Sequence, residues 1–293
     1  MIVFVATDLS AEADEAIRQA HAWASEGSTL VCCVVLAAPT LRPLFPQLAV
    51  EESVGGHDDG MEAARAVVER VAALTGRVEG SFEVCVERGA AYAEIVRAAE
   101  TRGADLVVVG SVGRSRLRRL FLGSTAEKVV RLAHCSVLVA RPSPQTGVVL
   151  AGIDLSEESL VALREAERYA RRRQGTLTAV QSYEAIVVPP GVSMMVTAPV
   201  PYVSPGVRRA QTEASLQRAV ERTGVSAASF TEEGPPVEVL VAAAEKQSAE
   251  LLVCGSRGAT GLARLVLGSV AEGVVRHAPC STLIVRAKEA RSP

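Results

Sequence analysis

The stretch of sequence that decides the fold occurs twice in this chain. Residues 105–141 read DLVVVGSVGRSRLRRLFLGSTAEKVVRLAHCSVLVAR, and residues 250–286 read ELLVCGSRGATGLARLVLGSVAEGVVRHAPCSTLIVR. The two segments align without gaps and are identical at about 21 of about 37 positions, which chance does not produce. The starts of the halves match as well, with VFVATDLS at residue 3 and VLAGIDLS at residue 149. The chain is therefore a duplication.

A repeat of about 145 residues is a whole domain and not a solenoid repeat. We therefore predict one domain over residues 1–142 and a second over residues 147–293. The residues between them belong to the stretch PSPQT, residues 142–146, which has the composition of a short polar linker. The full length of 293 residues also suits one or two domains.

Each half alternates short apolar runs with segments of helical spacing. In the first half the expected strands are Ile2–Ala6, Leu30–Leu36, Phe82–Val86, Leu106–Val109 and Val137–Ala140, and the expected helices are Ala11–Ser25, Met61–Leu74, Tyr92–Arg102 and Thr125–Ala133. In the second half the expected strands are Val148–Ile153, Leu177–Gln181, Ala227–Thr231, Leu251–Cys254 and Thr282–Val285. This alternation predicts the α/β class: two tandem, doubly wound, parallel five-stranded sheets. Ligands of such sheets bind outside the carboxyl ends of the strands, where the strand order reverses.

Glycines follow the fourth strand of each half with the same spacing. The patterns are Gly110-x2-Gly113-x9-Gly123-Ser124-Thr125 and Gly255-x2-Gly258-x9-Gly268-Ser269-Val270. Glycine lets a backbone approach a ligand closely, and the helix that follows offers free N–H groups to phosphate. The alternative is purely structural, because each serine also begins an S-x-x-E capping box, with Glu127 or Glu272 as its acid.

Asp8 and Asp154 close the first strand of each half, at the same edge of the sheet. A carboxylate there can accept hydrogen bonds from a ribose hydroxyl or an amino group. The structural alternative is that Asp-x-Ser only starts a turn. Arginines in the loop either bind phosphates or line a solvated loop face, and they are denser in the first loop, so we expect the two sites to differ in affinity. The arginines are Arg114, Arg116, Arg118 and Arg119 in the first half and Arg257 and Arg264 in the second. If only one site is occupied, we expect it to be the first, which also has the apolar Val34 where the second has Gln181.

Composition narrows the function further. The net charge of −2 makes nucleic acid and anionic membranes poor partners, and no apolar stretch is long enough for a membrane span. The N-terminus lacks the features of a signal peptide, and the six cysteines form no CxxC. We therefore expect a cytoplasmic protein with small buried cysteines. Two long segments, Ala37–Gly60 and Tyr183–Gly206, are expected to be surface linkers or lids.

These motifs together resemble the universal stress protein family, once in each half. The first-strand aspartate, DLVVVGS, the glycine loop and HCSVLVAR carry the resemblance, and the loop resembles the ATP-binding branch of the family. The resemblance implies a Rossmann-like, adenine nucleotide alpha hydrolase-like sheet with strand order 3-2-1-4-5. It also implies that the last strands, Val137–Ala140 and Thr282–Val285, pair within the chain as a pseudo-dimer. A homodimer of the tandem chain is a further expectation.

The same resemblance implies roles for individual residues. Asp8 and Asp154 would contact the adenosine, while Val34 and Gln181 would lie beside the adenine. Gln181 departs from the usual apolar choice. The phosphates and ribose would be held by Gly110, Gly113, Gly123, Ser124 and Thr125 in the first half and by Gly255, Gly258, Gly268, Ser269 and Val270 in the second.

The sequence favours nucleotide binding over catalysis. No Walker A pattern occurs, and the four histidines show no clustered ligand spacing. We therefore predict an ATP-binding sensor or regulator, with no catalytic residue or metal site assigned. The alternatives are a slow ATPase or adenylating ligase, and an interaction scaffold with empty nucleotide sites. ATP, ADP and AMP remain equivalent at this stage, and Mg²⁺ accompanying the phosphates stays open.

Overall fold

The computed structural model of the chain describes residues 1–11, 13–24, 27–36, 57–111, 122–184, 204–258 and 267–287. Among the predicted features, Gly113 and the arginines at 114–119 and 264 lie outside the described residues, as do residues 37–56 and 185–203 of the two long segments. The chain divides into two compact units. Unit 1 is Met1–Pro142 with the residues from Arg286 onward, and unit 2 is Ser143–Val285.

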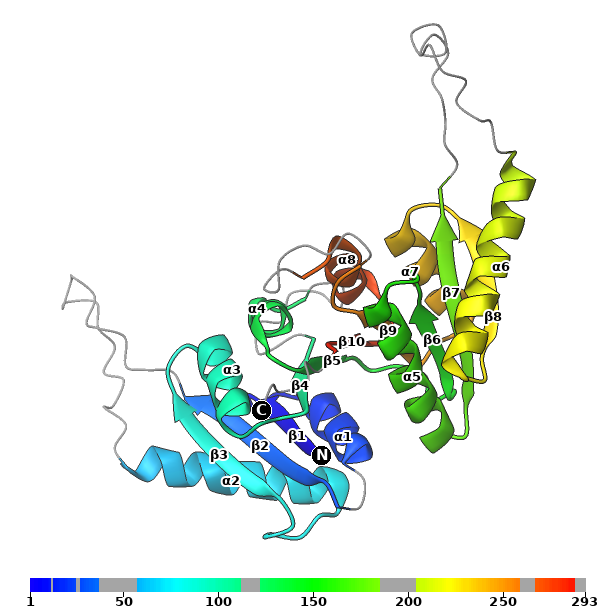
Figure 1. The fold of residues 1–293 in the computed structure, drawn as a ribbon. Coiled ribbons are helices and arrows are strands. Elements are labelled where there is room, and N and C mark those ends of the chain that lie inside the picture. Colours follow the sequence, from blue (N-terminus) through cyan, green and yellow to red (C-terminus); the bar gives the residue numbers. More distant parts are fainter. Residues whose placement is uncertain are drawn as a thin grey trace, which may run out of the picture. The chain divides into compact units, whose positions relative to one another are not determined.

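Unit 1 contains a five-stranded parallel sheet with the order β3-β2-β1-β4-β5, as predicted (Figure 1). Its strands are β1 (Ile2–Thr7), β2 (Thr29–Leu36), β3 (Glu83–Arg88), β4 (Leu106–Gly110) and β5 (Ser136–Ala140). Its helices are α1 (Asp14–Trp23), α2 (His57–Thr75), α3 (Ala91–Thr101) and α4 (Ser124–Leu132). The order reverses between β1 and β4, which places the expected ligand edge at the ends of these two strands.

Unit 2 repeats this arrangement with the order β8-β7-β6-β9-β10, again with parallel pairs. Its strands are β6 (Val148–Gly152), β7 (Thr176–Tyr183), β8 (Ala228–Glu233), β9 (Leu251–Gly255) and β10 (Ser281–Val285). Its helices are α5 (Glu157–Arg172), α6 (Pro205–Thr223), α7 (Pro236–Lys246) and α8 (Ser269–His277). In unit 2, β6 and β9 are therefore the strands between which the order reverses.

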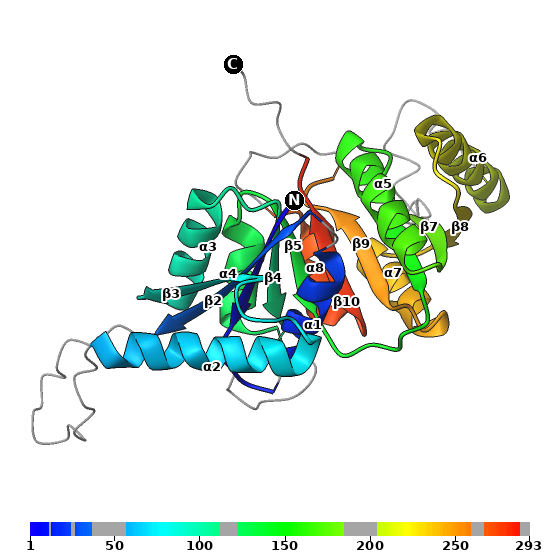
Figure 2. The ribbon, with the colours of Figure 1, turned by 90° about the horizontal axis from the view of Figure 1, so that it is seen from below.

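Helices cover both faces of each sheet, as right-handed crossovers require. In unit 1, α1 packs against α2 and α3 packs against α4, and Figure 2 shows this unit with α2 turned toward the viewer. In unit 2 the corresponding pairs are α5 with α6 and α7 with α8. The central strands β1, β4, β6 and β9 are buried between these layers, which explains their nearly continuous apolar sequences, whereas the edge strands β3 and β8 are partly exposed. None of the described helices is long and apolar enough to cross a membrane.

The six cysteines are all buried and free, as predicted. Burial raises the pKa of Cys32, Cys135 and Cys254 to about 12. Because the thiolate is the reactive form of cysteine, these three side chains are inert packing groups near neutral pH.

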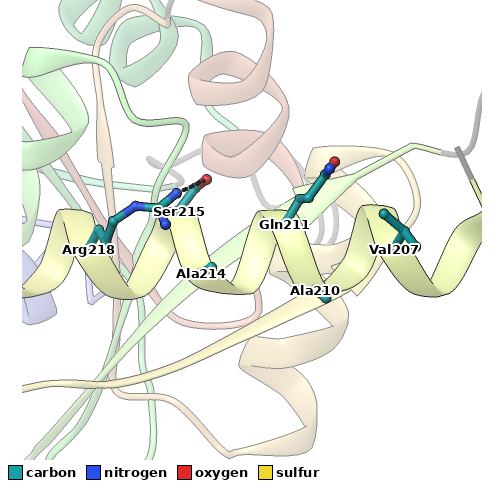
Figure 3. A pocket seen from close by; sticks show the side chains of 6 residues that line it. All are labelled: Val207, Ala210, Gln211, Ala214, Ser215 and Arg218. Carbon is teal, nitrogen blue, oxygen red and sulfur yellow. Dashed lines mark hydrogen bonds between the residues drawn. The ribbon is translucent and has the colours of Figure 1, made fainter. Parts of the chain in front are cut away.

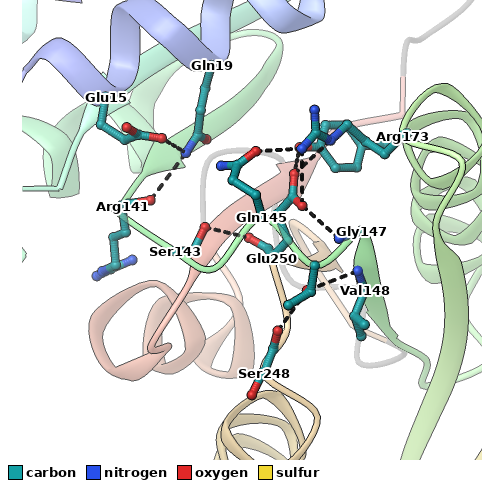
Figure 4. Close-up of polar contacts among 12 residues, drawn as sticks. Glu15, Gln19, Arg141, Ser143, Gln145, Gly147, Val148, Arg173, Ser248 and Glu250 are labelled. Carbon is teal, nitrogen blue, oxygen red and sulfur yellow. Dashed lines mark hydrogen bonds and ion pairs between the residues drawn. The ribbon is translucent and has the colours of Figure 1, made fainter.

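In both units an acidic residue just before the fourth strand anchors the start of the first strand. In unit 1, Asp105 accepts a hydrogen bond from the Ile2 backbone N–H at 2.8 Å. In unit 2 the equivalent Glu250 accepts from the Gly147 N–H at 2.9 Å, so each acid ties its fourth strand to the start of its first strand. Two side chains of the predicted linker also bond to unit 2, because Ser143 and Thr146 donate to backbone carbonyls there (Figure 4).

A histidine makes the stability of unit 1 depend on pH. Arg77 Nε lies 2.9 Å from His21 Nδ1, and burial, followed by the charge of Arg77, lowers the pKa of His21. The unfolded chain therefore takes up a proton at a higher pH than the folded unit does. The contribution of His21 to the stability of unit 1 is therefore fully present above the unfolded pKa of about 6.5. It is lost as the pH falls from there toward the lower pKa of the folded unit.

We expect the melting temperature of unit 1 to fall between pH 7.5 and pH 5.5 by more in the wild type than in a His21→Gln variant. Fluorescence of Trp23, which is the chain's one tryptophan and is buried in unit 1, reports this transition. Parallel pH profiles for the two proteins would show that His21 does not contribute.

Candidate functional site

The candidate site of each unit lies at the carboxyl edge of its sheet, where the two central strands end. In unit 1 Asp8 follows β1, and Gly110 is the last residue of the neighbouring strand β4. In unit 2 Asp154 follows β6 two residues after the strand ends, and Gly255 is the last residue of β9. The structure thus brings the first-strand aspartate and the first loop glycine to neighbouring positions in both units.

The two aspartates form the same turn. In unit 1 the backbone N–H and the hydroxyl of Ser10 donate to Asp8 Oδ1 at 3.0 and 2.5 Å. In unit 2 the N–H and the hydroxyl of Ser156 donate to Asp154 Oδ1 at 3.0 and 2.5 Å. The structural role predicted for the Asp-x-Ser sequence is therefore real.

The residue inside each turn has an unusual backbone conformation. Leu9 and Leu155 have φ values of 62° and 66°, a left-handed conformation that costs a residue with a side chain about 1 kcal/mol or more. Both units keep this strained leucine directly after the aspartate. Such strain gathers at functional sites, so the repeated outlier favours a role beyond the turn itself.

In unit 2 the aspartate lies directly against the glycine loop. A Cβ atom added to Gly258 would lie 2.7 Å from Asp154 Oδ2, which is closer than real Cβ contacts. Glycine at this position therefore lets the loop backbone approach the carboxylate. The corresponding Gly113 of unit 1 lies outside the described residues.

A backbone hydrogen bond closes the glycine loop at its base in each unit. The Gly123 N–H donates to the Ser111 carbonyl at 2.7 Å, and the Gly268 N–H donates to the Ser256 carbonyl at 2.9 Å. These bonds hold the beginning of α4 beside the end of β4, and the beginning of α8 beside the end of β9. The predicted loop glycines at both ends of the pattern are thereby brought together.

The predicted capping boxes at Ser124 and Ser269 are wrong. Gly123 and Gly268 are the N-cap residues, with extended ψ values of 143° and 147°, and a glycine N-cap has no side chain with which to cap its helix. Each serine is the first helical residue and not the N-cap. The glutamate of its S-x-x-E pattern is therefore the fourth helical residue, whereas a capping box needs the glutamate at the third. The partner glutamate N–H, for example that of Glu127, instead bonds to the glycine carbonyl at 3.0 Å.

This shift weakens the purely structural interpretation of the serines, because they do not serve as caps. The first N–H groups of a helix have no partner within it, and the N-cap glycine has no side chain that could accept from them. Ser124 and Ser269 are exposed, while Thr125 and Val270 are half-buried in the same turn. The beginning of each helix therefore keeps the groups that bind an anion.

The positions expected beside a base lie on the neighbouring second strands. Val34 pairs with Thr7 across β1 and β2 and is 4% exposed. Gln181 follows Val180, which pairs with Gly152 across β6 and β7, so it occupies the equivalent place in unit 2. The Oε1 atom of Gln181 is enclosed and has no hydrogen-bond donor in the described part of the chain. The two units therefore differ in polarity at this position.

Sequence reasoning missed Glu158, an acidic residue that holds the glycine loop of unit 2. Its carboxylate accepts from the Ser256 hydroxyl at 3.0 Å, the Arg257 N–H at 2.9 Å and Arg257 Nε at 2.6 Å. Ser256 is 1% exposed, so this contact forms under the loop. The signal available in the sequence was the recurrence of glutamate at 12 and 158 and of serine at 111 and 256.

An open depression of about 590 Å³ lies elsewhere, along α6 (Figure 3). Its lining residues are Val207, Ala210, Gln211, Ala214, Ser215 and Arg218. All of them come from one helix, and none is a predicted site residue. Ligand sites gather polar groups that converge from several elements, so we place the candidate site at the carboxyl edge of each sheet.

The family model and the related sequences that match this chain all belong to one family. The sequence model described as the universal stress protein family matches residues 1–141 and again residues 146–286. A universal stress protein of Mycobacterium tuberculosis is 34% identical over 198 residues, 62% of each chain, so the match spans 62% of that relative's length. One of Mycolicibacterium smegmatis is 28% identical over 306 aligned residues, covering 97% of this chain and 96% of that protein.

Solved structures share the fold. The crystal structure of a universal stress protein from Archaeoglobus fulgidus has a TM-score of 0.66 and 20% sequence identity to this chain. The match covers 97% of this chain and 98% of that one, so it spans both units.

Proposed function

The chain belongs to the universal stress protein family, and we propose that each of its two units binds an adenine nucleotide as a sensor or regulator and not as a catalyst. The observation that carries the proposal is the contact between Asp154 and the loop glycine Gly258, beside a helix whose N-cap is the glycine Gly268. A carboxylate suited to sugar hydroxyls and the first N–H groups of a helix, which suit phosphate, thereby lie at one edge.

The proposed nucleotide lies across three strand ends in each unit. Parallel strands are about 4.8 Å apart, so the ends of β9, β6 and β7 span about 10 Å. In unit 2 the phosphates would lie at the beginning of α8, the ribose at Asp154, and the base beside Gln181. In unit 1 the corresponding groups are the beginning of α4, Asp8 and Val34. Gly110 and Gly255, the last residues of β4 and β9, would lie beside the ribose and phosphates at the start of each loop.

The proposal covers binding, with hydrolysis as the rival function. The sequence lacks the Walker A pattern whose lysine and hydroxyl serve phosphoryl transfer in many ATPases. The test compares the rate of phosphate release from ATP by the wild type with that of a Gly113→Asp, Gly258→Asp double variant, with and without Mg²⁺. A clearly higher rate in the wild type would show that the protein also hydrolyses ATP. An empty interaction scaffold is the other alternative, and it predicts no nucleotide at all.

The direct test is to denature the purified protein and to identify any released nucleotide by chromatography and mass spectrometry. Release of about two adenine nucleotides per chain is expected if both sites are filled, and about one if the sites differ. Titration with ATP, ADP and AMP then ranks the ligands. Absence of released nucleotide together with no heat and no thermal shift on adding ATP would sink the proposal.

Replacement of both aspartates tests the proposed sugar contact. We expect Asp8→Asn with Asp154→Asn to weaken ATP binding about ten- to hundredfold, because a hydrogen bond to a charged group contributes about 1.5–3 kcal/mol. Isothermal titration calorimetry measures the effect. The control is Glu221→Gln, which removes an exposed carboxylate on α6. Equal ATP affinity in the double variant and the control would contradict the assignment.

The assembly and the compartment stay predictions. Pairing of β5 with β10 inside the chain, homodimerisation of the tandem chain and a cytoplasmic location are parts of the proposal. The free, buried cysteines suit a reducing compartment.

A further inference from the structure

Arg257 has an unusual position in the glycine loop of unit 2. It lies between the buried Ser256 and Gly258, the glycine that contacts Asp154. Both its backbone N–H and its guanidinium bind Glu158, a residue of the first turn of α5. Main chain and side chain are therefore fixed by one carboxylate.

The ion pair uses only part of the guanidinium. Nε donates to Glu158 Oε1 at 2.6 Å, and one terminal nitrogen, Nη2, forms a short ion pair with the same oxygen. A guanidinium carries five N–H donors in a rigid fork, so the Nη1 side is not used by Glu158. The side chains of Arg257 and Glu158 are 30% and 15% exposed, which leaves the cation partly open to solvent. Arg257 can keep Glu158 and accept a second anionic partner.

The same residue lies against the beginning of α8. A Cβ atom added to Gly268, the N-cap of this helix, would lie 3.5 Å from Arg257 Cα and 3.7 Å from the Gly258 nitrogen. This is ordinary van der Waals contact. The cation is therefore carried by backbone that packs directly on the helix terminus where we propose that phosphate binds.

The first half of the sequence lacks this cation. Valine stands at position 112, which aligns with Arg257, whereas Ser111 and Glu12 match Ser256 and Glu158. The acid and the serine are thus present in both halves, but the arginine is present in only one. The two repeats therefore differ in charge at this one position of the loop, although the first loop carries other arginines further along, at 114, 116, 118 and 119.

We propose that Arg257 makes unit 2 selective for the phosphate chain of a nucleotide, and that Glu158 is the residue that positions it. This inference rests on the proposed nucleotide function. Arginine binds phosphate oxygens bidentately, and holding one edge of the guanidinium on Glu158 reduces the entropy lost when the other edge engages the ligand. Unit 2 therefore gains more affinity from each added phosphate than a loop with valine gains.

The experiment measures the affinities of ATP, AMP and adenosine for unit 2 in the full chain by calorimetry. A Gly113→Asp substitution, which adds a carboxylate to the loop of the first half, removes the other site. In an Arg257→Val variant, which copies the first half, we expect ATP to bind at least about tenfold more weakly, a change of about 1.4 kcal/mol. Adenosine should change less than about twofold, because it carries no phosphate.

Three further variants separate positioning from general damage. Glu158→Gln should lower the ATP-to-adenosine affinity ratio in the arginine protein and leave it unchanged in the Arg257→Val background, because the glutamate acts through the arginine. Arg257→Lys should restore only part of the ratio, since lysine lacks the fork. Arg276→Val removes an exposed cation from α8, where Arg276 pairs with Glu272, and should leave the ratio unchanged.

The possible failures are distinguishable. If ATP does not bind unit 2 at all in the Gly113→Asp protein, the proposed function fails there, and this inference fails with it. If ATP binds but Arg257→Val weakens ATP and adenosine equally, Arg257 is only structural and the inference is overturned. Where Arg257→Val does not fold, Arg257→Lys decides: an ATP-to-adenosine affinity ratio equal to that of the Gly113→Asp protein overturns the inference, and a lowered ratio with unchanged adenosine affinity supports it.

Discussion

Replacing Glu250 with alanine is expected to lower the free energy of unfolding of unit 2 by about 3 kcal/mol. The carboxylate is buried, and it accepts from Gly147 N–H at 2.9 Å, from the Tyr169 hydroxyl at 2.7 Å and from Arg173 Nε at 2.9 Å (Figure 4). Removing one partner of a buried ion pair typically costs 3–5 kcal/mol, and Arg173 is a third exposed, so the lower end applies.

Thermal unfolding followed by circular dichroism measures this effect, with an expected decrease in melting temperature of about 10 °C for unit 2. Trp23 fluorescence follows unit 1 separately and should shift less. Glu165→Ala is the matched control, because it removes an exposed glutamate paired with Arg168 and should cost less than about 1 kcal/mol. Equal melting temperatures for the two variants would show that the Glu250 network contributes little.

The sequence alone predicted the duplication and the strand and helix alternation, and it placed Asp8, Asp154 and the loop glycines at the edge of the sheet where we propose the site. These features are local or repeated, so the apolar runs that form β1 and β4 can be recognised without knowing their neighbours. The order of the strands is not local, and its prediction depended on the family resemblance. The structure confirms this order in both units.

Contacts between distant residues were not predictable in the same way. Glu158 and Arg257 are 99 positions apart, and nothing in the local sequence of either residue indicates the pair. The helix starts failed for a different reason. Glycine and serine are both acceptable N-cap residues, and the S-x-x-E pattern favoured Ser124, whereas the extended backbone at Gly123 sets the helix start one residue earlier.

Replacing Gly258 with alanine is expected to weaken nucleotide binding to unit 2 at least about tenfold with little loss of stability. The added Cβ would lie 2.7 Å from Asp154 Oδ2, and the carboxylate must therefore move. Gly258 is not among the residues with positive φ, so alanine adds no backbone strain there. The clash is with the end of a side chain, and such contacts are relieved by a small rotation.

The variant therefore displaces the proposed sugar ligand without removing it. ATP titration of the Gly113→Asp background measures the loss, which corresponds to about 1.4 kcal/mol for each factor of ten. Gly206→Ala is the control, because a Cβ atom at this exposed helical position of α6 meets nothing within 4 Å. It should leave ATP affinity unchanged.

Combining Gly258→Ala with Asp154→Asn decides whether the two residues act as a unit. If the alanine acts by moving the carboxylate, the double variant should bind ATP about as weakly as either single variant, because residues in contact do not contribute additively. Additive losses would mean that Gly258 contacts the nucleotide through its own backbone, independently of Asp154. Wild-type affinity in the Gly258→Ala protein would remove the Asp154–Gly258 contact as the basis of the proposed site, since the carboxylate cannot keep its position beside an alanine.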